Sequence, residues 1–340
     1  MDKRMTIGID LAKNVFYVVA LGTGTSALWR KKLTRAKLIS TFAQLPPSQV
    51  ALEACGGAHY WARALQRMGH EVVMLPPQHV KGYARGQKND YNDAFAIAEA
   101  CAHGRIRPVR AKSVSEQDLQ SFHQMRRQMV AEQTRVINQV RGLLAEYGVV
   151  IPQGKAAFAK ALPRILGETN PELTPRMREL LHRQWEHFVA LRDEVDWFNR
   201  QLTAQVKADE VCQRLMTVPA FGPVVASAFR NRVGDGLAFA SGRALSAAVG
   251  LVPKQWTTGG QTILLGITKK GDSQLRSLVI HGARSVLQHA EGKDDPLSRW
   301  ALAVKARRGH NKAVVALANK LVRIAWAVVV SGERYQPRLA

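Results

Sequence analysis

The sequence predicts an α/β domain followed by mostly helical parts, and three observations lead to this. Short segments rich in β-branched or alternating apolar residues lie at 6–10, 15–21, 27–33, 50–54 and 71–75. Helical spacing separates and follows the later segments, at 35–43, 58–69 and 89–103. Beyond residue 111 helical spacing dominates. A mixed sheet flanked by helices, joined to helical domains, therefore follows.

The first three strands are close in sequence and predict a meander. A polar turn at Lys13 and Asn14 separates the first two, and the Gly-Thr-Gly-Thr run at 22–25 separates the second from the third. The later helix at 89–103 is rich in alanine and opens with acidic residues, which suit the positive end of its dipole. We assign residues 1–110 to this domain.

Residues 111–210 are predicted to form a helical coiled-coil arm. Between 116 and 147, apolar residues recur close to every 3.5 positions, at Leu119, Phe122, Met125, Met129, Val136, Val140, Leu143 and Tyr147. A second helix opens at the capping pair Thr174-Pro175 and carries Met177, Leu181, Phe188, Val195, Phe198 and Leu202. The stretch 152–170 is predicted to be a loop with a short helix. A plain intramolecular helix pair is an equal alternative to a dimerising arm.

Residues 211–340 form the third predicted domain, which is mostly helical. LMTVPAFGPVVASAF at 215–229 resembles a helix-hairpin-helix, in which backbone amides hold a phosphate, although Ala220 stands where the first glycine is usual. A small helix and turn at 243–253 precede a Gly/Thr/Lys-rich loop at 254–272. Two or three basic helices follow at 273–330.

The charge of the chain predicts a polyanionic partner. Forty-nine Lys and Arg against twenty-six Asp and Glu give a formal charge of +23, and nucleic acid is the leading candidate. Three separated cysteines without zinc-ligand spacing predict reduced thiols in a cytoplasmic protein. The longest apolar stretch, 314–330, is interrupted by Lys320 and Arg323, so we expect a buried helix and no membrane partner.

Four acidic residues form the candidate catalytic and metal site. Asp10 and Glu53 each end a predicted strand, and Asp90 and Asp93 lie three apart at a helix start. Together these carboxylates would repel one another unless hard divalent cations bound them, and two Mg²⁺ ions would then suit phosphodiester chemistry. Each acid taken alone is better interpreted as a turn or capping residue.

The order of these elements resembles known nucleases. A strand with Asp, a hairpin, a helix, a strand with Glu and a helix with Asp-x-x-Asp is the layout of RNase H and RuvC-like enzymes. GIDLAKN at 8–14, LEACGG at 52–57 and KNDYNDAFAIAEA at 88–100 resemble the signature blocks of DEDD-type insertion-sequence transposases, relatives of the Piv DNA invertase. AAVGLVPKQWTTGGQTILLGITKKGDSQLRSLVIHGARSV at 247–286 is similar to the C-terminal transposase domain of that family.

The resemblance implies a DNA recombinase with an RNase H/RuvC-like N-terminal domain. In this family the four acids bind Mg²⁺, and a serine hydroxyl of the C-terminal domain attacks DNA to form a covalent intermediate. A structured bridge RNA pairs with donor and target DNA, and members act as homodimers or homotetramers. We therefore expect a cytoplasmic bacterial protein that acts at the nucleoid.

The expected nucleophile is Thr258, where the family usually has serine. Threonine keeps the hydroxyl, but its extra methyl restricts χ1 and crowds the line of attack. Gly259 and Gly260 follow it and would let a phosphate approach. Thr257 is the fallback. Ser241 and Ser246 are interpreted as structural, as a helix cap and part of a small apolar face.

Basic residues around and after this loop are predicted to contact phosphates, which orients nucleic acid without reading its sequence. They are Lys254, Lys269, Lys270, Arg276, Arg284, Arg307 and Arg308. An ordinary solvated basic face is the alternative.

Two alternative functions remain open. One is a hydrolytic RuvC-like nuclease that uses the acids and water, with Thr258 structural. The other is a catalytically weakened relative that binds RNA or DNA but has lost its chemistry with the serine. A covalent protein–DNA adduct would exclude the first, and activity gained on changing Thr258 to Ser would point to the second.

Overall fold

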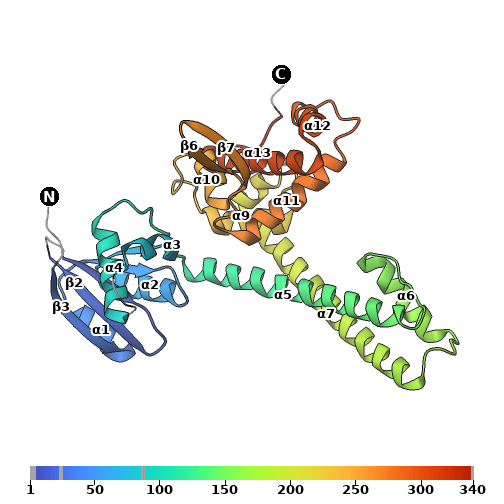
Figure 1. Ribbon diagram of the computed structural model, residues 1–340, viewed down its shortest axis with the longest axis horizontal. Coiled ribbons are helices and arrows are strands. Elements are labelled where there is room, and N and C mark those ends of the chain that lie inside the picture. The colour runs from blue at the N-terminus through green and yellow to red at the C-terminus, as the bar shows by residue number, and fades with distance from the viewer. Residues whose placement is uncertain (1–4, 23–25, 86, 88, 338–340) are drawn as a thin grey trace. The chain divides into compact units, whose positions relative to one another are not determined.

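The computed structural model describes residues 5–22, 26–85, 87 and 89–337 (Figure 1). The chain divides into two compact units, Met1–Gln117 and Asp118–Ala340, and each is described by itself. The division into three domains at 110 and 210 stays a prediction. The predicted turn at 22–25 lies mostly outside the described residues.

The first unit contains a five-stranded mixed sheet. Its strands are β1 (Thr6–Asp10), β2 (Val15–Leu21), β3 (Ala27–Thr34), β4 (Gln49–Glu53) and β5 (Glu71–Leu75). Their order is β3-β2-β1-β4-β5. Strand β2 is antiparallel to both β1 and β3, and β4 and β5 run parallel to β1. The predicted mixed α/β fold and meander are confirmed, and the order is consistent with an RNase H-like domain.

Alternation along β1 directs its side chains to two different layers. Ile7 and Ile9 are buried in a core shared with α1 (Arg35–Ala43) and α2 (Ala58–Arg67). Gly8, which lies between them, touches α4 (Asp90–Ala102), and a Cβ added there would lie 2.1 Å from Ala94 O and 2.6 Å from Ala98 N. The absent side chain therefore lets α4 lie directly on the strand.

The end of the first unit is held by a capping box at the start of α5 (Val114–Ala145). Ser113 N–H donates to Glu116 Oε2 at 2.9 Å, and Glu116 N–H donates to Ser113 Oγ at 3.2 Å. Arg110 donates to both oxygens of the Glu116 carboxylate, at 2.6 and 2.9 Å. Earlier in this unit, α3 (Pro77–Val80) and the 3₁₀ helix η1 (Lys81–Tyr83) connect β5 to the segment before α4.

In the second unit, α5 packs against α6 (Lys155–Gly167) and α7 (Pro175–Ala208) around one apolar core. Thr174 caps α7 as predicted, accepting from Met177 N–H at 3.2 Å. Helix α6 is longer than the short helix expected in 152–170. Its buried residues Phe158, Leu162 and Ile165 have helical spacing, and their contact with α7 stabilises the helix despite Pro163 within it.

The buried positions of α5 match the predicted seam only in part, at Val136 and Val140. Met125 and Leu143 are exposed, whereas Val136, Val140 and Leu144 are buried at intervals of four residues. An interval of four follows the stripe of a straight helix packed on its neighbour, rather than a 3.5-residue repeat. In α7, all six predicted apolar residues are buried.

Six further helices build the rest of the second unit around a separate core. They are α8 (Glu210–Leu215), α9 (Pro223–Val233), α10 (Gly242–Val249), α11 (Ser273–Gln288), α12 (Pro296–Arg308) and α13 (His310–Ser331). Helix α13 is long and apolar enough to cross a membrane by length and composition alone. Its apolar residues, including Leu317, Leu321 and Val328, are buried against this core, as predicted for a buried helix.

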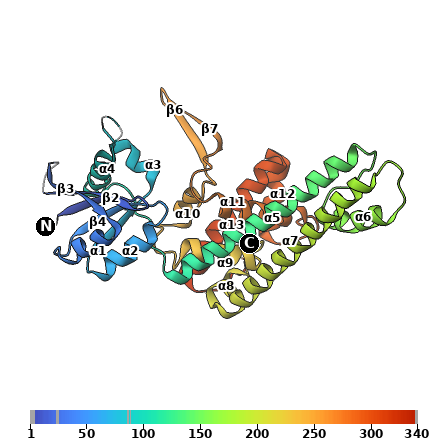
Figure 2. The same ribbon diagram turned by 90° about the horizontal axis from the view of Figure 1, so that it is seen from below.

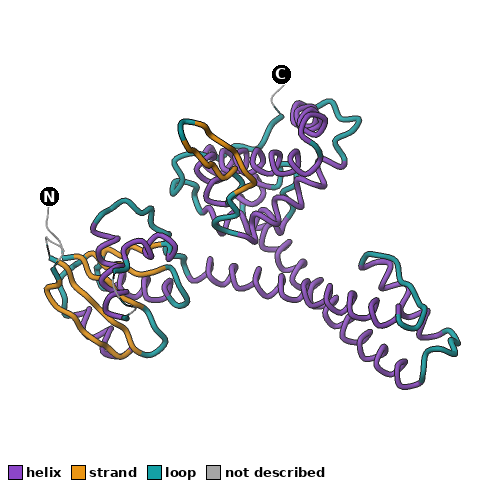
Figure 3. The backbone as a smooth tube through the Cα atoms, viewed as in Figure 1, coloured by secondary structure: helices purple, strands orange, loops and turns teal. Residues whose placement is uncertain are grey.

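Residues 253–267 form a β-hairpin, so most of the segment 254–272 is not the predicted loop. Strands β6 (Pro253–Thr258) and β7 (Gln261–Ile267) pair antiparallel, and in Figure 2 the hairpin projects from the helices beside it. Figure 3 shows strands, within the described chain, only in the N-terminal sheet and in this hairpin. Gly259 and Gly260 both have positive φ, 55° and 77°, which a two-residue hairpin turn of type I′ requires.

Candidate active site

Two neighbouring parallel strands bring Asp10 and Glu53 to the same edge of the sheet. Ile9 and Leu52 are register partners in β1 and β4, and each acid is the next residue and the last of its strand. Both side chains are half-buried. Parallel strands end at a common edge, so the fold places these two carboxylates side by side.

The first turn of α4 supplies the other two acids. Asn89 caps the helix, its side-chain oxygen accepting from Tyr91 N–H at 2.9 Å. Asp90 and Asp93 follow in the first turn, where the positive end of the helix dipole stabilises negative charge. The contact of Gly8 with the next turn fixes how close this helix end lies to β1.

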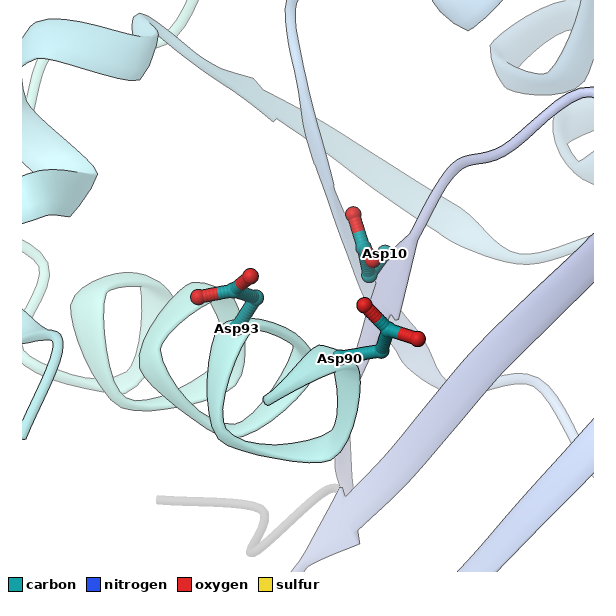
Figure 4. A group of neighbouring side chains, drawn as sticks. All are labelled: Asp10, Asp90 and Asp93. Carbon is teal, nitrogen blue, oxygen red and sulfur yellow. The ribbon is translucent and has the colours of Figure 1, made fainter. Parts of the chain in front are cut away.

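Three of the four predicted acids meet at this edge. Asp10, Asp90 and Asp93 each offer a carboxylate oxygen, and these oxygens lie within 4.8 Å of one another. Figure 4 shows Asp90 and Asp93 on the first turn of α4 beside Asp10. No described lysine or arginine forms an ion pair with Asp90 or Asp93. Two carboxylates at this distance repel each other by about 1 to 4 kcal/mol.

Glu53 lies outside this group of three but within reach of its field. Burial raises the pKa of Glu53, the negative charge of Asp93 raises it further, and Lys81 lowers it. Burial and the charge of Asp93 both make the negative charge of Glu53 more costly than it is on an exposed carboxylate. All four predicted acids therefore occupy one electrostatic neighbourhood.

Two neighbours of the acids were missed by sequence reasoning. Lys81, in η1, is close enough to lower the pKa of Glu53. Cys55 follows β4, and partial desolvation of its sulfur together with the charges of Glu53 and Asp10 raises the pKa of its thiol, although the residue is exposed. An isolated lysine or cysteine carries no sequence signal, because only the folded chain brings it to the site.

The donor set fits a divalent metal. Carboxylate oxygens are the ligands that Mg²⁺ and Mn²⁺ prefer. On an octahedral ion with bonds of about 2.1 Å, opposite ligand oxygens are about 4.2 Å apart. The oxygens of the three aspartates lie within 4.8 Å of one another, so small side-chain movements would bring them to that spacing.

The predicted nucleophile lies in the second unit, at the tip of the hairpin. Thr258 is the last residue of β6 and pairs with Gln261 across the turn. The Thr257 hydroxyl contacts that of Thr262 at 3.2 Å and accepts from Gln255 Nε2 at 3.0 Å. No described residue makes a hydrogen bond to the Thr258 hydroxyl, which lies on the other face of the strand. Thr257 is thus engaged and Thr258 is available.

The base of the hairpin is tightly packed. A Cβ on Gly250 would lie 2.3 Å from Lys270 O, and one on Gly271 would lie 1.8 Å from Ala248 O. Arg276 donates to Val249 O at 2.8 Å and to Lys270 O at 3.2 Å. Arg276 therefore braces this base.

The other predicted basic residues are solvent-exposed, where a phosphate can reach them. They are Lys254 on β6, Lys269 and Lys270 after β7, Arg284 on α11, and Arg307 and Arg308 in the last turn of α12. Ser241 and Ser246 are structural as predicted: Ser241 caps α10, and Ser246 is buried and donates to Asn319 O.

The chain is similar to transposases along nearly its whole length. A DEDD transposase family model matches residues 7–149, and a model of the IS116/IS110/IS902 transposase family matches residues 212–297. The transposase for insertion sequence element IS1111A of Coxiella burnetii is 40% identical over 97% of this chain and 91% of its own. A probable family 20 transposase of Pseudomonas aeruginosa is 42% identical over 97% of this chain and 98% of its own. The transposase for insertion sequence element IS1328 of Yersinia enterocolitica is 37% identical over 96% and 97%.

Proposed function

Because the chain belongs to the IS116/IS110/IS902 family of insertion-sequence transposases, we propose that it cuts and rejoins DNA through a covalent protein–DNA intermediate. Transposases act on DNA, and the charge of +23 suits that partner. The observation that carries the proposal is the meeting of Asp10, Asp90 and Asp93 at one edge of the sheet, with Glu53 beside them.

Asp10, Glu53, Asp90 and Asp93 would hold Mg²⁺, in our proposal two ions. When bound, the metal would favour ionisation of the attacking hydroxyl and stabilise the negative charge on the leaving oxygen. The fold fixes the positions of the four acids, because the ends of β1 and β4 are neighbours in the sheet and the start of α4 packs on β1 at Gly8.

Thr258 would supply the attacking hydroxyl. Its Oγ1 would form a bond to phosphorus while the bond from phosphorus to a sugar oxygen breaks, and the hydroxyl proton would leave for a base or solvent. The threonine phosphodiester keeps the energy of the broken linkage, so a second DNA hydroxyl can displace Thr258 and reseal the strand without ATP. The free hydroxyl of Thr258, against the engaged hydroxyl of Thr257, supports this choice.

A structured bridge RNA that pairs with donor and target DNA would choose the sites, as in the family that the sequence resembles. The protein would then act in the cytoplasm, at the nucleoid. RNA pairing explains how a protein can act at defined sequences while its own contacts are made to phosphates.

We also propose that the chain acts as a homodimer or homotetramer through a coiled-coil arm. Large apolar side chains remain exposed on α5 and α7, namely Met125, Leu143, Leu180 and Trp197. Light scattering after size-exclusion chromatography checks this: a monomeric mass at micromolar concentration would count against it.

The turn between α8 and α9 would act as a helix-hairpin-helix that holds a phosphate. Ala220 has a φ of 74°, the left-handed conformation that the usual glycine adopts. Its methyl is accommodated because α11 has no side chain opposite: a Cβ on Gly282 would lie 2.7 Å from Ala220 Cβ. The glycine opposite Ala220 supports the view that the hairpin keeps its geometry although alanine replaces the usual glycine at 220.

The test is to incubate the protein with Mg²⁺, the RNA made from the ends of its element, and labelled donor and target DNA. A denaturing gel then reports label attached to protein. Thr258→Ala and Asp90→Ala are the informative variants, and Thr257→Ala is a matched control from the same strand. We expect covalent label with the wild type and Thr257→Ala, and none with the other two.

The other outcomes assign the alternative functions. Free cleaved DNA that persists in Thr258→Ala would mean hydrolysis by the acidic site, as in a RuvC-like nuclease. Binding without any cleavage, with activity gained in Thr258→Ser, would mean a catalytically weakened relative. If the reaction proceeds equally well with and without the RNA, RNA guidance is refuted and the rest of the proposal stands.

A further inference from the structure

A cavity of about 1300 Å³ lies in the second unit, away from the hairpin that carries Thr258. Its walls come from the start of α10, the start of α12, one side of α13 and the segment 333–337 that follows α13. It is larger than the roughly 300 to 1,000 Å³ usual for a site that takes one small molecule. The volume therefore suits a segment of a polymer, longer than one monomer.

Four cationic side chains line this cavity: Arg243, Lys320, Arg323 and Arg334. Among the described lining residues the one carboxylate is Glu333, and no described carboxylate forms an ion pair with any of the four. A concave surface with this excess of unpaired positive charge attracts an anion strongly. The lining therefore suits a group with several negative charges.

Lys320 is the least solvated of these cations. Its ammonium lies over the Trp300 ring, 4.2 Å from the centroid, and burial together with Arg323 lowers its pKa. The two like charges stand three residues apart on α13, so they face the same side of the helix. An anion bound between them would relieve both the repulsion and the desolvation.

The start of α10 is held rigidly beside these cations. A Cβ on Gly242 would lie 3.0 Å from Arg323 Cα, so the first turn of α10 rests directly on α13. Ser241 caps this turn, accepting from Ala244 N–H at 3.2 Å. Arg243 and Arg323 therefore project from two helices whose contact fixes their spacing.

Apolar and aromatic groups form the rest of the lining. Leu297, Ile324 and Val328 contribute apolar surface, and Tyr335 contributes a half-buried ring. The backbone of Tyr335 is fixed to the turn before α9, since its N–H donates to Thr217 Oγ1 at 2.9 Å. A planar base can stack on a ring held in this way.

We propose that this cavity binds one or two nucleotides of a single-stranded nucleic-acid segment, with phosphates between Arg243, Lys320, Arg323 and Arg334 and a base against Tyr335. Stacking on aromatic rings within a basic groove is the usual way in which proteins hold unpaired nucleotides. The cavity shares no residue with the acidic cluster or with the hairpin that carries Thr258. The proposed site rests on the family's action on nucleic acid and not on the proposed covalent mechanism.

The test uses the full chain and fluorescein-labelled eight-nucleotide strands, oligothymidylate and oligouridylate, read by fluorescence anisotropy. The variants are Arg323→Glu, Arg334→Glu and Lys320→Met, of which Arg334→Glu changes an exposed residue after the last helix and carries little risk to folding. Arg299→Glu on α12 is the matched control, because Arg299 is exposed and does not line the cavity. Thermal melting checks that each variant is folded.

We expect each glutamate variant in the cavity to raise the Kd about tenfold, and the control to raise it by less than about threefold. The preference between the two strands shows whether DNA or RNA is the natural occupant. A strand carrying 5-iodouracil should cross-link to the peptide that contains Tyr335.

Equal weakening in all charge variants, with no cross-link at Tyr335, would refute the cavity and leave only diffuse attraction. Failure of the wild type to bind either strand would also refute it. The covalent-label assay is run in parallel, so loss of DNA cleavage there bears on the proposed mechanism and leaves the cavity to be judged by binding.

Discussion

Replacing Gly8 with alanine should dismantle the acidic site without touching any acid. The backbone of Gly8 lies in β1 and has no positive φ, so alanine is compatible with its conformation. The added Cβ would lie 2.1 Å from Ala94 O, 2.6 Å from Ala98 N and 2.8 Å from Ala98 Cβ. Because two of these three atoms belong to the backbone of α4, the helix itself has to move.

The size of that movement follows from the overlap. Non-bonded contacts of carbon are about 3.5 Å long, so α4 must shift by more than 1 Å, roughly, relative to β1. Metal sites tolerate about 0.2 Å in ligand distances. The shift separates Asp90 and Asp93 on α4 from Asp10 on β1, and overpacking of this kind costs about 1 to 3 kcal/mol of stability.

Isothermal titration with Mn²⁺ measures the site, and urea unfolding measures the stability. We expect Gly8→Ala to weaken Mn²⁺ binding more than about tenfold, on the basis of the 1 Å displacement. Gly82→Ala is the matched control, since a Cβ on Gly82 has no atom within 4 Å. Adding Ala98→Gly should restore little, because Ala94 O still collides. Wild-type Mn²⁺ affinity in a folded Gly8→Ala protein would refute this account.

Three further perturbations give measurable outcomes. Arg110 holds the pKa of Glu116 down to about 2, so the stabilisation by the Glu116 carboxylate is present above the unfolded pKa and is lost as the pH falls through about 2. Glu116→Gln should lower the free energy of unfolding by about 1 kcal/mol at pH 7, after allowance for solvent screening, and by only a small part of that at pH 2. An equal loss at both pH values would show that the charge is irrelevant. Burial raises the pKa of Cys101 to about 11 and that of Cys212 to about 12. Ellman's reagent at pH 8 should therefore label only the exposed Cys55 in the native protein, and all three thiols after unfolding. Rapid labelling of two or three thiols in the native protein would contradict the core packing. Thr258→Ser should speed formation of the covalent adduct about fivefold by relieving about 1 kcal/mol of rotamer restriction, and a slower adduct would argue against Thr258 as nucleophile.

Local patterns were enough to predict the N-terminal sheet. Alternation and β-branching mark each of its strands, and the positions of Asp10 and Glu53 at strand ends are a direct consequence of where those runs stop. The role of Gly8 could not be predicted in the same way. A glycine in a strand shows only that a side chain is missing, and the helix that uses the space is more than eighty residues away.

For the hairpin and for α6 the sequence contains a signal for the observed structure, but a second local pattern favoured a different prediction. Gly259-Gly260 between two β-branched runs is a hairpin turn signal, but the lysines and glycines around it favoured a loop. In α6, Pro163 hid the helical spacing of Phe158, Leu162 and Ile165. Neither the cavity beside α13 nor the neighbours of the acids had any local pattern, because they arise where distant segments pack.

The hairpin places Thr258 far from the helices on which it is mounted, so small rotations at its base move the hydroxyl by large distances. Five residue steps separate Pro253, where β6 begins, from Thr258, so at about 3.3 Å per step the hydroxyl is carried about 17 Å from the pivot. At that length a rotation of only about 3° swings the tip by about 1 Å, and an error of that size in a reacting group can cost about a hundredfold in rate. The position of the Thr258 hydroxyl is therefore determined at the base of the hairpin. There the close packing at Gly250 and Gly271 leaves no room for movement, and Arg276 joins the segments before and after the hairpin through Val249 O and Lys270 O.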